Sequence, residues 1–335
     1  MKISVVIPVY NVESYIAPCL QSVMDQTYNG PIECLLVDDC GNDNSMGVVD
    51  DMLGKYGGPI EFKVLHHEHN RGLSAARNTG TEAASGDYVY YMDSDDAISL
   101  DCMELMAKVV SYHPEVEVVQ GAMGAIPYKK YYDLELYKTP RFVDDNDWIR
   151  FNAYKYGERL PVNATNKLLK KSFLVENALT FKEGINNEDE LWSFLLYERV
   201  KYWAVISDKT YLHYFRPCSI MGTLDEQKRA SNMGVVVSEA LKTVDNPFRD
   251  LQVYRCMDAF VKYVFPHAND RSLVKRLYVR FLFSLLRMGR VNLAFWFMVG
   301  FFNKSKRRKL LYETMPLVYK ETSERYGALF CNAHE

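Results

Sequence analysis

The sequence predicts an α/β fold with a mostly parallel central sheet flanked by helices, followed by a helical C-terminal extension. Two observations predict this. Short apolar segments of strand length alternate with segments of helical periodicity in the N-terminal part, and from about residue 224 the pattern is typical of helices only. Near-continuous apolar strands joined by helices are typical of a parallel sheet covered on both faces. We therefore expect two domains, residues 1–223 and residues 224–335.

Apolar runs bounded by polar or turn-forming residues define the expected strands. They cover residues 3–9, 32–37, 60–65, 88–92 and 116–119. Ile16, Leu20 and Val23 share one face of a helix after the first strand. Further helices are expected over residues 100–111, with Ser99 as N-cap, and from Glu188 to Arg199. Because ligands of such sheets bind at the carboxyl ends of the strands, the residues that follow each strand are candidates for a site.

Composition narrows the class of protein. Of the 335 residues, 48% are hydrophobic and 25% are charged, which is typical of a globular chain. The seven cysteines form no C-x-x-C pair, so we expect a reducing cytoplasm rather than a disulfide framework or a structural zinc site. Pro8 interrupts the first apolar run, which is too short for a secretory signal. Arg287 and Arg290 separate the most apolar C-terminal stretches, so no transmembrane helix is expected.

Charge is distributed unevenly along the chain. Residues 247–335 contain 16 Lys and Arg against 7 Asp and Glu, whereas the preceding residues contain 24 against 36. The acidic N-terminal part does not favour a nucleic-acid partner. The basic segment 303–309 leaves two interpretations open. In the first, it binds peripherally to the anionic inner face of the cytoplasmic membrane. In the second, it is the solvated side of a helical cap or an oligomer contact. The sequence leaves the oligomeric state open.

The segment VYYMDSDD, residues 89–96, places three carboxylates directly after an expected buried strand. In an extended chain residues i and i+2 project to the same side, so Asp93 and Asp95 can present oxygens to one hard cation or to a nucleotide. Mn²⁺ or Mg²⁺ is the expected ion. The alternative is that these acids interact with the N-terminus of the next helix.

Polar residues also follow the second and third strands. Asp38 and Asp39 could accept hydrogen bonds from a base or a ribose, or could cap a turn. Arg71 and Arg77 lie on a loop and the helix that it opens, where guanidinium groups could pair with a diphosphate. G-x-G-x-x-G and P-loop motifs are absent, which does not favour dinucleotide dehydrogenases or P-loop NTPases.

Two further segments carry candidate groups. Glu188, Asp189 and Glu190 open an expected helix, where they are either favourable charges at the helix N-terminus or include a general base. His213 is a candidate metal ligand and Arg216 a candidate cation on an expected loop. The histidine-rich segment 66–69 lacks the spacing of a helical zinc site and is interpreted as a strand end.

The order of these motifs resembles the family 2 glycosyltransferases that build bacterial surface and capsular polysaccharides. The resemblance spans about residues 1–225 and rests on SVVIPVYN, LLVDD, NRGLSAARNTG, YYMDSDD, NED and a Y-x-x-Y-x-R-x-x-S-I-M loop. It implies a GT-A fold. The turn CGNDNS after Asp39 and the position of Cys218 depart from the usual family pattern.

The resemblance also implies roles for individual residues. The nucleotide of the donor would be held by Pro8, Val9, Tyr10, Asn11, Asp39, Arg71 and Asp93. Asp38, Arg77 and Ser94, in the same segments, are further candidates for nucleotide binding. Asp93 would contact the ribose or the divalent metal, Asp95 would hold the metal, for which His213 is the further candidate ligand named above, and Asp189 would be the catalytic base. Glu188, Arg216 and Ser219 would belong to the loops around donor and acceptor.

The expected reaction is inverting transfer of a sugar from a nucleoside diphosphate, UDP by the resemblance, to a hydroxyl of a saccharide or lipid-linked saccharide. A sugar-nucleotide pyrophosphorylase would have a glycine-rich loop where this chain has PVYN. The remaining alternative is a catalytically silent binding module in a polysaccharide assembly complex. The retained Asp39, Asp93, Asp95 and Asp189 favour the enzyme.

Overall fold

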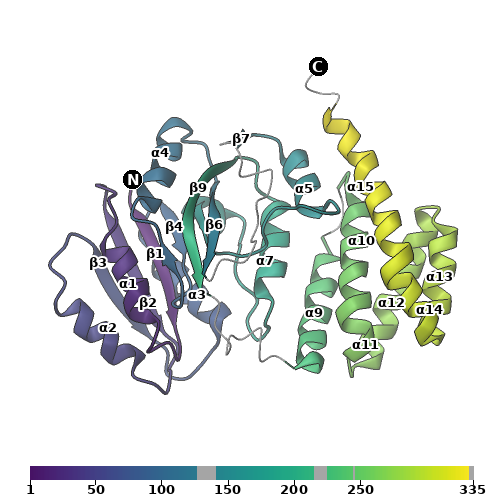
Figure 1. Ribbon diagram of the computed structural model, residues 1–335, viewed down its shortest axis with the longest axis horizontal. Helices are drawn as coiled ribbons and strands as arrows, with labels where there is room; N and C mark the ends of the chain where they lie inside the picture. Colours follow the sequence, from purple (N-terminus) through teal and green to yellow (C-terminus); the bar gives the residue numbers. More distant parts are fainter. Residues whose placement is uncertain (127–140, 215–224, 244–245, 332–335) are drawn as a thin grey trace. The chain divides into compact units, whose positions relative to one another are not determined.

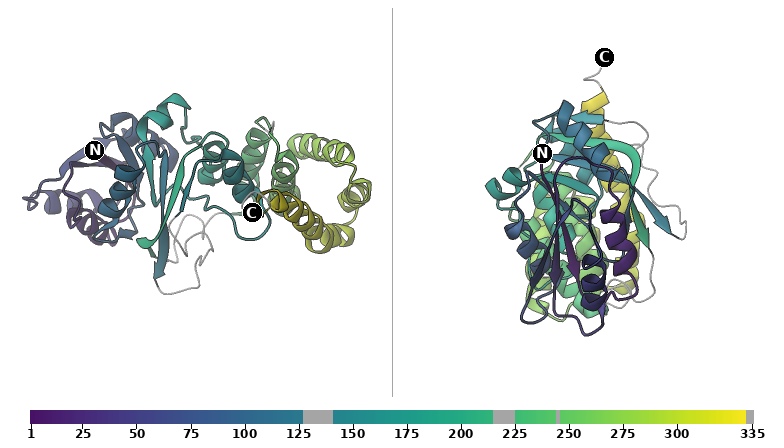
Figure 2. Two further views of the ribbon diagram at one scale, coloured as in Figure 1. Left: turned by 90° about the horizontal axis from the view of Figure 1, so that it is seen from above. Right: turned by 90° about the vertical axis from the view of Figure 1, so that its left-hand side faces the viewer.

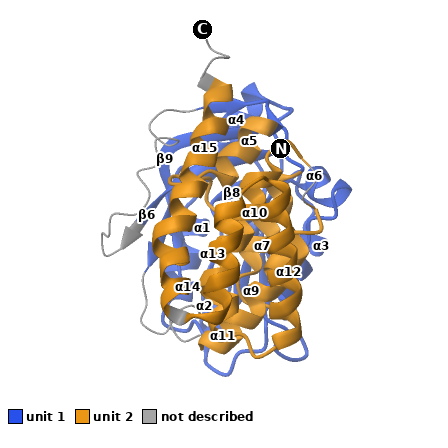
Figure 3. Cartoon of the chain, turned by 90° about the vertical axis from the view of Figure 1, so that its right-hand side faces the viewer, with its two compact units in different colours: residues 1–146, 162–184, 199–219 blue, residues 147–161, 185–198, 220–335 orange. Residues whose placement is uncertain are grey.

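The computed structural model describes residues 1–126, 141–214, 225–243 and 246–331. Contacts divide the chain into two compact units (Figure 3). The sheet unit contains residues 1–146, 162–184 and 199–219, and the helical unit contains residues 147–161, 185–198 and 220–335. Two short segments upstream of residue 224 thus group with the C-terminal helices. A domain boundary at residues 223 and 224 stays a prediction.

A nine-stranded sheet forms the sheet unit, in the order β3-β2-β1-β4-β8-β6-β9-β5, with β7 paired to β9 (Figure 1). The strands are β1 (Ile3–Val9), β2 (Ile32–Asp38), β3 (Glu61–His66), β4 (Tyr88–Tyr91), β5 (Ala97–Ile98), β6 (Val118–Ile126), β7 (Arg141–Val143), β8 (Lys167–Lys170) and β9 (Trp203–Tyr214). Strand β8 is antiparallel to β4 and β6, and β6 is parallel to β9. The five strands expected from the sequence are present, but residues 211–214, which were expected to lie on a loop, belong to β9.

The four N-terminal strands are parallel, and this decides where the polar residues gather. Strand β1 pairs with β2 and β4, and β2 pairs with β3. Val9 is the register partner of Asp38, and Asp38 is that of His66. Parallel strands end at the same edge, so the segments that follow β1, β2, β3 and β4 share one edge of the sheet. The expected mostly parallel α/β sheet is confirmed.

Helices α1 (Ile16–Met24), α2 (Ser45–Leu53) and α3 (Leu73–Ala83) connect the parallel strands. Helix α3 packs closely on the sheet, because Gly80 leaves no room for a Cβ beside Val6 and Val37. The expected start of the next helix is wrong. Helix α4 (Cys102–Tyr112) begins after Asp101, and the Ser99 hydroxyl donates to Asp101 Oδ1 (2.8 Å) instead of capping the helix.

The helical unit contains most of α5 (Asn146–Tyr154), α7 (Glu188–Tyr197) and the C-terminal helices, whose axes run side by side and are seen partly end-on in Figure 2. These are α9 (Glu226–Ala240), α10 (Arg249–Ala259), α11 (Phe265–His267), α12 (Arg271–Arg287), α13 (Val291–Phe302), α14 (Lys304–Lys309) and α15 (Met315–Cys331). Phe260, Phe281 and Phe297 form an aromatic cluster in its core. Within the described ranges, every helix is too short or too polar to span a bilayer.

Candidate active site

The loops after β1 and β2 meet at the carboxyl edge of the sheet. Pro8 and Val9 are buried at the end of β1, whereas Tyr10 is 40% exposed. Asn11 adopts a left-handed conformation (φ 51°), and its Oδ1 accepts a hydrogen bond from the backbone N–H of Asn42 (2.7 Å). An asparagine tolerates this conformation better than most residues. The bond fixes the turn after β2 against the residues that follow β1.

Asp39 organises the loop that leads into α3. Its carboxylate is buried, and the backbone N–H groups of Arg71 and Gly72 donate to Oδ1 and Oδ2 (2.8 Å each). The His67 ring nitrogen Nδ1 lies 2.7 Å from Oδ1. Gly72 has φ 88°, a conformation that favours glycine. Asp39 therefore holds the Arg71 loop in place, a role that the sequence did not indicate.

Asp38, at the end of β2, is the more accessible member of this pair. Its Oδ1 accepts from the Cys40 N–H (3.0 Å), and its Oδ2 lies 3.0 Å from His66 Nδ1. This is the turn role that the sequence left open for Asp38. Its contact with a nucleotide stays a prediction.

The two arginines of the α3 segment have different environments. Arg71 pairs with Glu183 at 3.3 Å, and both side chains are more than 40% exposed. Arg77 is buried, and its Nη2 lies 2.9 Å from Asp93 Oδ1. Its guanidinium also lies over the Phe181 ring, 5.2 Å from the centroid. A buried arginine is costly unless its charge is compensated, so Arg77 and Asp93 stabilise each other. In this structure Arg77 supports Asp93, and its pairing with a diphosphate stays a prediction.

The DSDD segment that follows β4 is fixed by β9. The Asp93 N–H donates to the Tyr211 hydroxyl oxygen (3.2 Å), and the Tyr211 hydroxyl donates to Asp96 Oδ2 (2.7 Å). Ser94 is buried, whereas Asp93 and Asp95 are partly exposed. The segment therefore presents Asp93 and Asp95 on a backbone anchored from the neighbouring strand.

Asp96 is the residue that sequence reasoning missed. Its carboxylate is 2% exposed, accepts from the Tyr214 N–H (2.9 Å) and lies 3.0 Å from His213 Nδ1. This hydrogen bond raises the pKa of His213. A carboxylate on Nδ1 fixes the ring and presents Nε2 to a ligand. The available signal was a third acid in the cluster, followed by the apolar Ala97 and Ile98 of a buried strand.

The acidic first turn of α7 belongs to the helical unit. Glu188 is buried, and Glu190 pairs with Arg255 of α10 at 2.5 Å. Asp189 lies between them and is partly exposed. Because these residues are in the other unit, the roles of Asp189 and Glu188 stay predictions. Arg216 and Ser219 lie outside the described residues.

The donor atoms at the sheet edge suit a hard or borderline divalent ion. Carboxylates at Asp93 and Asp95 and an oriented imidazole at His213 are ligands that Mn²⁺ accepts, and carboxylates suit Mg²⁺. In the described part of the chain no three His, Cys, Asp or Glu side chains are arranged to hold a metal ion by themselves. Such ions are commonly bound by one or two carboxylates together with substrate phosphates. The residues therefore fit an ion shared with a diphosphate rather than a cage made only of protein.

Comparison with known proteins matches residues 4–167 to the family model described as glycosyl transferase family 2. This region belongs to glycosyl transferase family 2. The expected family and the expected glycosyltransferase class are thereby confirmed. The matched residues contain β1 to β4 and the whole DSDD segment.

Relatives and solved structures agree with the family. The chain is 28% identical over 273 residues to glycosyltransferase GlyG of Streptococcus pneumoniae serotype 4, covering 76% of this chain and 84% of GlyG. It is 42% identical over 119 residues to glycosyltransferase GlyA of the same organism, and that match spans 35% of this chain but only 16% of GlyA. The crystal structure of S. aureus TarS 1-349 in complex with UDP-GlcNAc superimposes with a TM-score of 0.69 at 20% identity, covering 97% of this chain and 92% of that one. The expected GT-A fold is confirmed.

Proposed function

We propose that the chain is an inverting glycosyltransferase that moves a sugar from a UDP-linked donor to a hydroxyl of a glycan or lipid-linked saccharide. The observation that carries the proposal is a set of contacts at one sheet edge. Asp39 accepts a hydrogen bond from the Arg71 loop, Arg77 pairs with Asp93, and Asp96 contacts the His213 ring. In each of these three contacts a candidate binding residue, Arg71, Asp93 or His213, is held by a second residue. Such preorganisation is what donor binding and transition-state stabilisation need.

The proposed roles follow the chemistry of the groups. Asn11, Asp39 and Arg71 would contact the nucleotide, and Asp93, Asp95 and His213 would hold Mn²⁺ or Mg²⁺. A bound divalent ion neutralises charge that develops on a leaving diphosphate. Asp189 would accept the proton of the attacking hydroxyl, so that a single displacement inverts the anomeric carbon. UDP is proposed from the family resemblance, and the TarS complex with UDP-GlcNAc supports it by analogy of fold.

The test is release of nucleoside diphosphate from purified protein with Mn²⁺ and a panel of sugar nucleotides, with and without saccharide acceptors. We expect one UDP-sugar to be consumed, faster with an acceptor present. Absence of turnover with every donor, together with tight nucleotide binding, would favour a silent binding module instead.

The base is tested separately with Asp189→Asn. We expect this variant to bind UDP and Mn²⁺ like the wild type while transfer falls at least ~100-fold, because loss of general base catalysis costs about that much. Glu239→Gln, an acid-to-amide change at an acid of α9 paired with Lys242, is the matched control and should transfer normally. Equal transfer by Asp189→Asn and wild type would remove Asp189 from the mechanism.

A further inference from the structure

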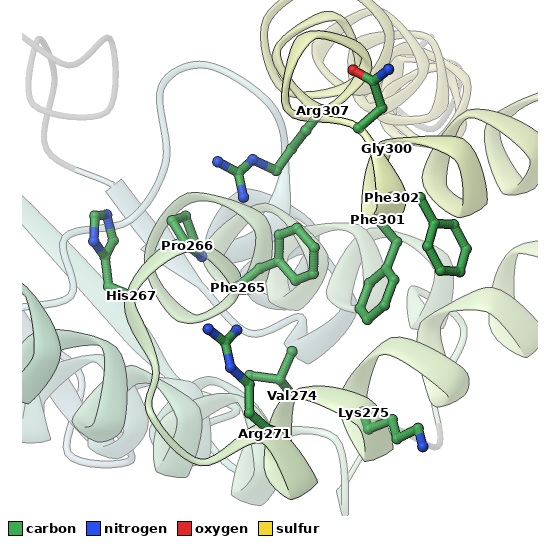
Figure 4. A pocket seen from close by; sticks show the side chains of 11 residues that line it. Phe265, Pro266, His267, Arg271, Val274, Lys275, Gly300, Phe301, Phe302 and Arg307 are labelled. Carbon is green, nitrogen blue, oxygen red and sulfur yellow. The ribbon is translucent and has the colours of Figure 1, made fainter.

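The helical unit contains a cavity of about 830 Å³ formed by α11, α12, α13 and the start of α14 (Figure 4). Its lining combines two kinds of side chain. Phe265, Phe301 and Phe302 supply aromatic surface, and Arg271, Lys275 and Arg307 supply positive charge. A cavity of this size is in the range of small-molecule and cofactor sites.

The charge of this cavity has one sign. None of its described lining residues is acidic, and Arg271, Lys275 and Arg307 form no ion pair with a carboxylate anywhere in the described part of the chain. The Arg307 guanidinium lies over the Phe265 ring, 5.3 Å from its centroid, and in Figure 4 Arg271 also extends toward this ring. Arginines held near one another without an acid are suited to a phosphate group.

An apolar stripe runs along α13 and ends at this cavity. Val291, Phe295, Met298 and Phe302 follow one another at the spacing of a single helix face and are 62%, 51%, 43% and 82% exposed. Phe302, the last of them, also lines the cavity. Helix α12 carries a second exposed stripe of Val279, Phe283 and Leu286. So many large exposed apolar side chains on neighbouring helices mark an interaction surface.

Basic residues continue directly from the α13 stripe. Lys306, Arg308 and Lys309 on α14 are exposed, and the ammonium groups of Lys306 and Lys309 lie 5.4 Å and 4.7 Å from the Trp296 ring centroid. Apolar side chains next to Lys and Arg, on helices that do not span a bilayer, are typical of helices that bind in the plane of an anionic membrane. A second copy of the chain is a poorer occupant, because a symmetric contact would bring the same cations together.

We propose that the helical unit binds the surface of a bilayer containing anionic phospholipid. The α13 stripe lies against the acyl boundary, and a lipid phosphate enters the cavity near Arg271 and Arg307, with Lys275 on the same lining adding positive charge. This assigns a ligand class to a cavity outside the sheet edge and does not depend on the transfer reaction.

Flotation of the purified full chain with liposomes tests the proposal. One set of vesicles contains only phosphatidylcholine, and the other contains phosphatidylcholine with phosphatidylglycerol. We expect the chain to float with the second set and not with the first. Replacing three cations, as in the variant Arg271→Gln/Lys275→Gln/Arg307→Gln, should weaken partitioning roughly a hundredfold, because each basic residue at an anionic surface contributes about fivefold.

The matched control removes the same charge elsewhere in the unit. Lys228, Arg249 and Lys320 are exposed cations that do not line the cavity, so their triple Gln variant should float like the wild type. Phe302→Ser should reduce flotation without changing charge, and circular dichroism checks that each variant is folded. Donor turnover of the cavity variant should match the wild type. Equal loss in both triple variants, or no flotation of the wild type, would overturn the proposal, as would a light-scattering dimer that Phe302→Ser converts to monomer.

Discussion

The buried carboxylate of Asp96 lies 3.0 Å from Nδ1 of His213, and this contact joins two residues 117 positions apart in the sequence. Asp96 also accepts from Tyr211 and from the backbone of Tyr214. One acid thus fixes three residues near the end of β9, Tyr211, His213 and Tyr214, beside the DSDD segment. The contact gives the third acid of the cluster a positioning role, distinct from the metal or ribose contacts proposed for Asp93 and Asp95.

Replacing Asp96 with Asn should disorient His213 without removing a proposed ligand. We expect Mn²⁺-dependent donor turnover to fall by about 10- to 100-fold, the usual effect of losing the outer partner of a metal-binding histidine. The measurement is the Mn²⁺ concentration required for half-maximal turnover, which should rise. Asp101→Asn, the same chemical change at an exposed residue of the next helix start, is the control. An unchanged Mn²⁺ requirement in Asp96→Asn would contradict the positioning role.

Asp39→Asn should weaken binding of the donor nucleotide. The amide can accept only one of the two N–H groups of Arg71 and Gly72 and would point its own donor at the other. Leaving a buried hydrogen-bonding group unpaired costs about 1–3 kcal/mol. The loop is then less well ordered before the nucleotide binds, and each 1.4 kcal/mol needed to order it weakens binding about tenfold. Calorimetric titration with UDP measures this loss. The neighbouring Asp38→Asn, at a more exposed carboxylate, should have the smaller effect, and the reverse order would refute this account.

Gly80→Ala should destabilise the sheet unit. The new methyl would overlap Val6 on β1 and lie within 3.3 Å of Val37 on β2, so α3 would have to move away from the sheet. Overpacking of this kind typically costs about 1–3 kcal/mol, which exceeds the gain in helix propensity. Thermal unfolding should show a lower midpoint. Gly57→Ala, where a Cβ meets no atom within 4 Å, should unfold like the wild type.

Glu33 should make the stability of the sheet unit depend on pH. Burial by itself raises the pKa of Glu33, but hydrogen bonds from Ser4, Ser85 and Lys63 outweigh it and hold the pKa below its ordinary value. The carboxylate therefore stabilises the fold above its unfolded pKa, near ~4.3, and this contribution is lost as the pH falls toward the lower folded pKa.

Urea unfolding of Glu33→Gln measures this contribution. We expect the variant to be about 1–3 kcal/mol less stable than the wild type at pH 7, since its amide cannot accept all the hydrogen bonds. The difference should shrink as the pH falls below ~4.3. Glu61→Gln is the control. Glu61 is a more exposed acid that contacts Lys2 and Lys63, as Glu33 does, and its replacement should change stability little. A difference that stays constant down to pH 3 would contradict the assignment.

Local patterns predicted β1 to β4 and β6, because each contains an apolar run bounded by polar residues, whereas β5, β7, β8 and β9 were not predicted. Helix starts were less predictable. Ser99 has the right chemistry for an N-cap, but its hydroxyl donates a hydrogen bond to Asp101 Oδ1. Helix α4 begins two residues later than expected. The contacts of Asp39 with Arg71 and of Arg77 with Asp93 could not be read from spacing, because they depend on how two parallel strands and one helix pack.

Periodicity and short motifs are local properties, so they were sufficient to predict the alternation of strands and helices in the N-terminal part, the family, and the residues that follow the parallel strands. Which of these side chains support one another depends on how distant parts of the chain pack together. Burial made Asp96 a partner of His213 and Arg77 a partner of Asp93, since a charge removed from water requires an opposite charge or a hydrogen bond that the chain supplies from a distant position. The cavity of the C-terminal helices likewise required folding, which brought Arg271 and Arg307 from separate helices to the same lining.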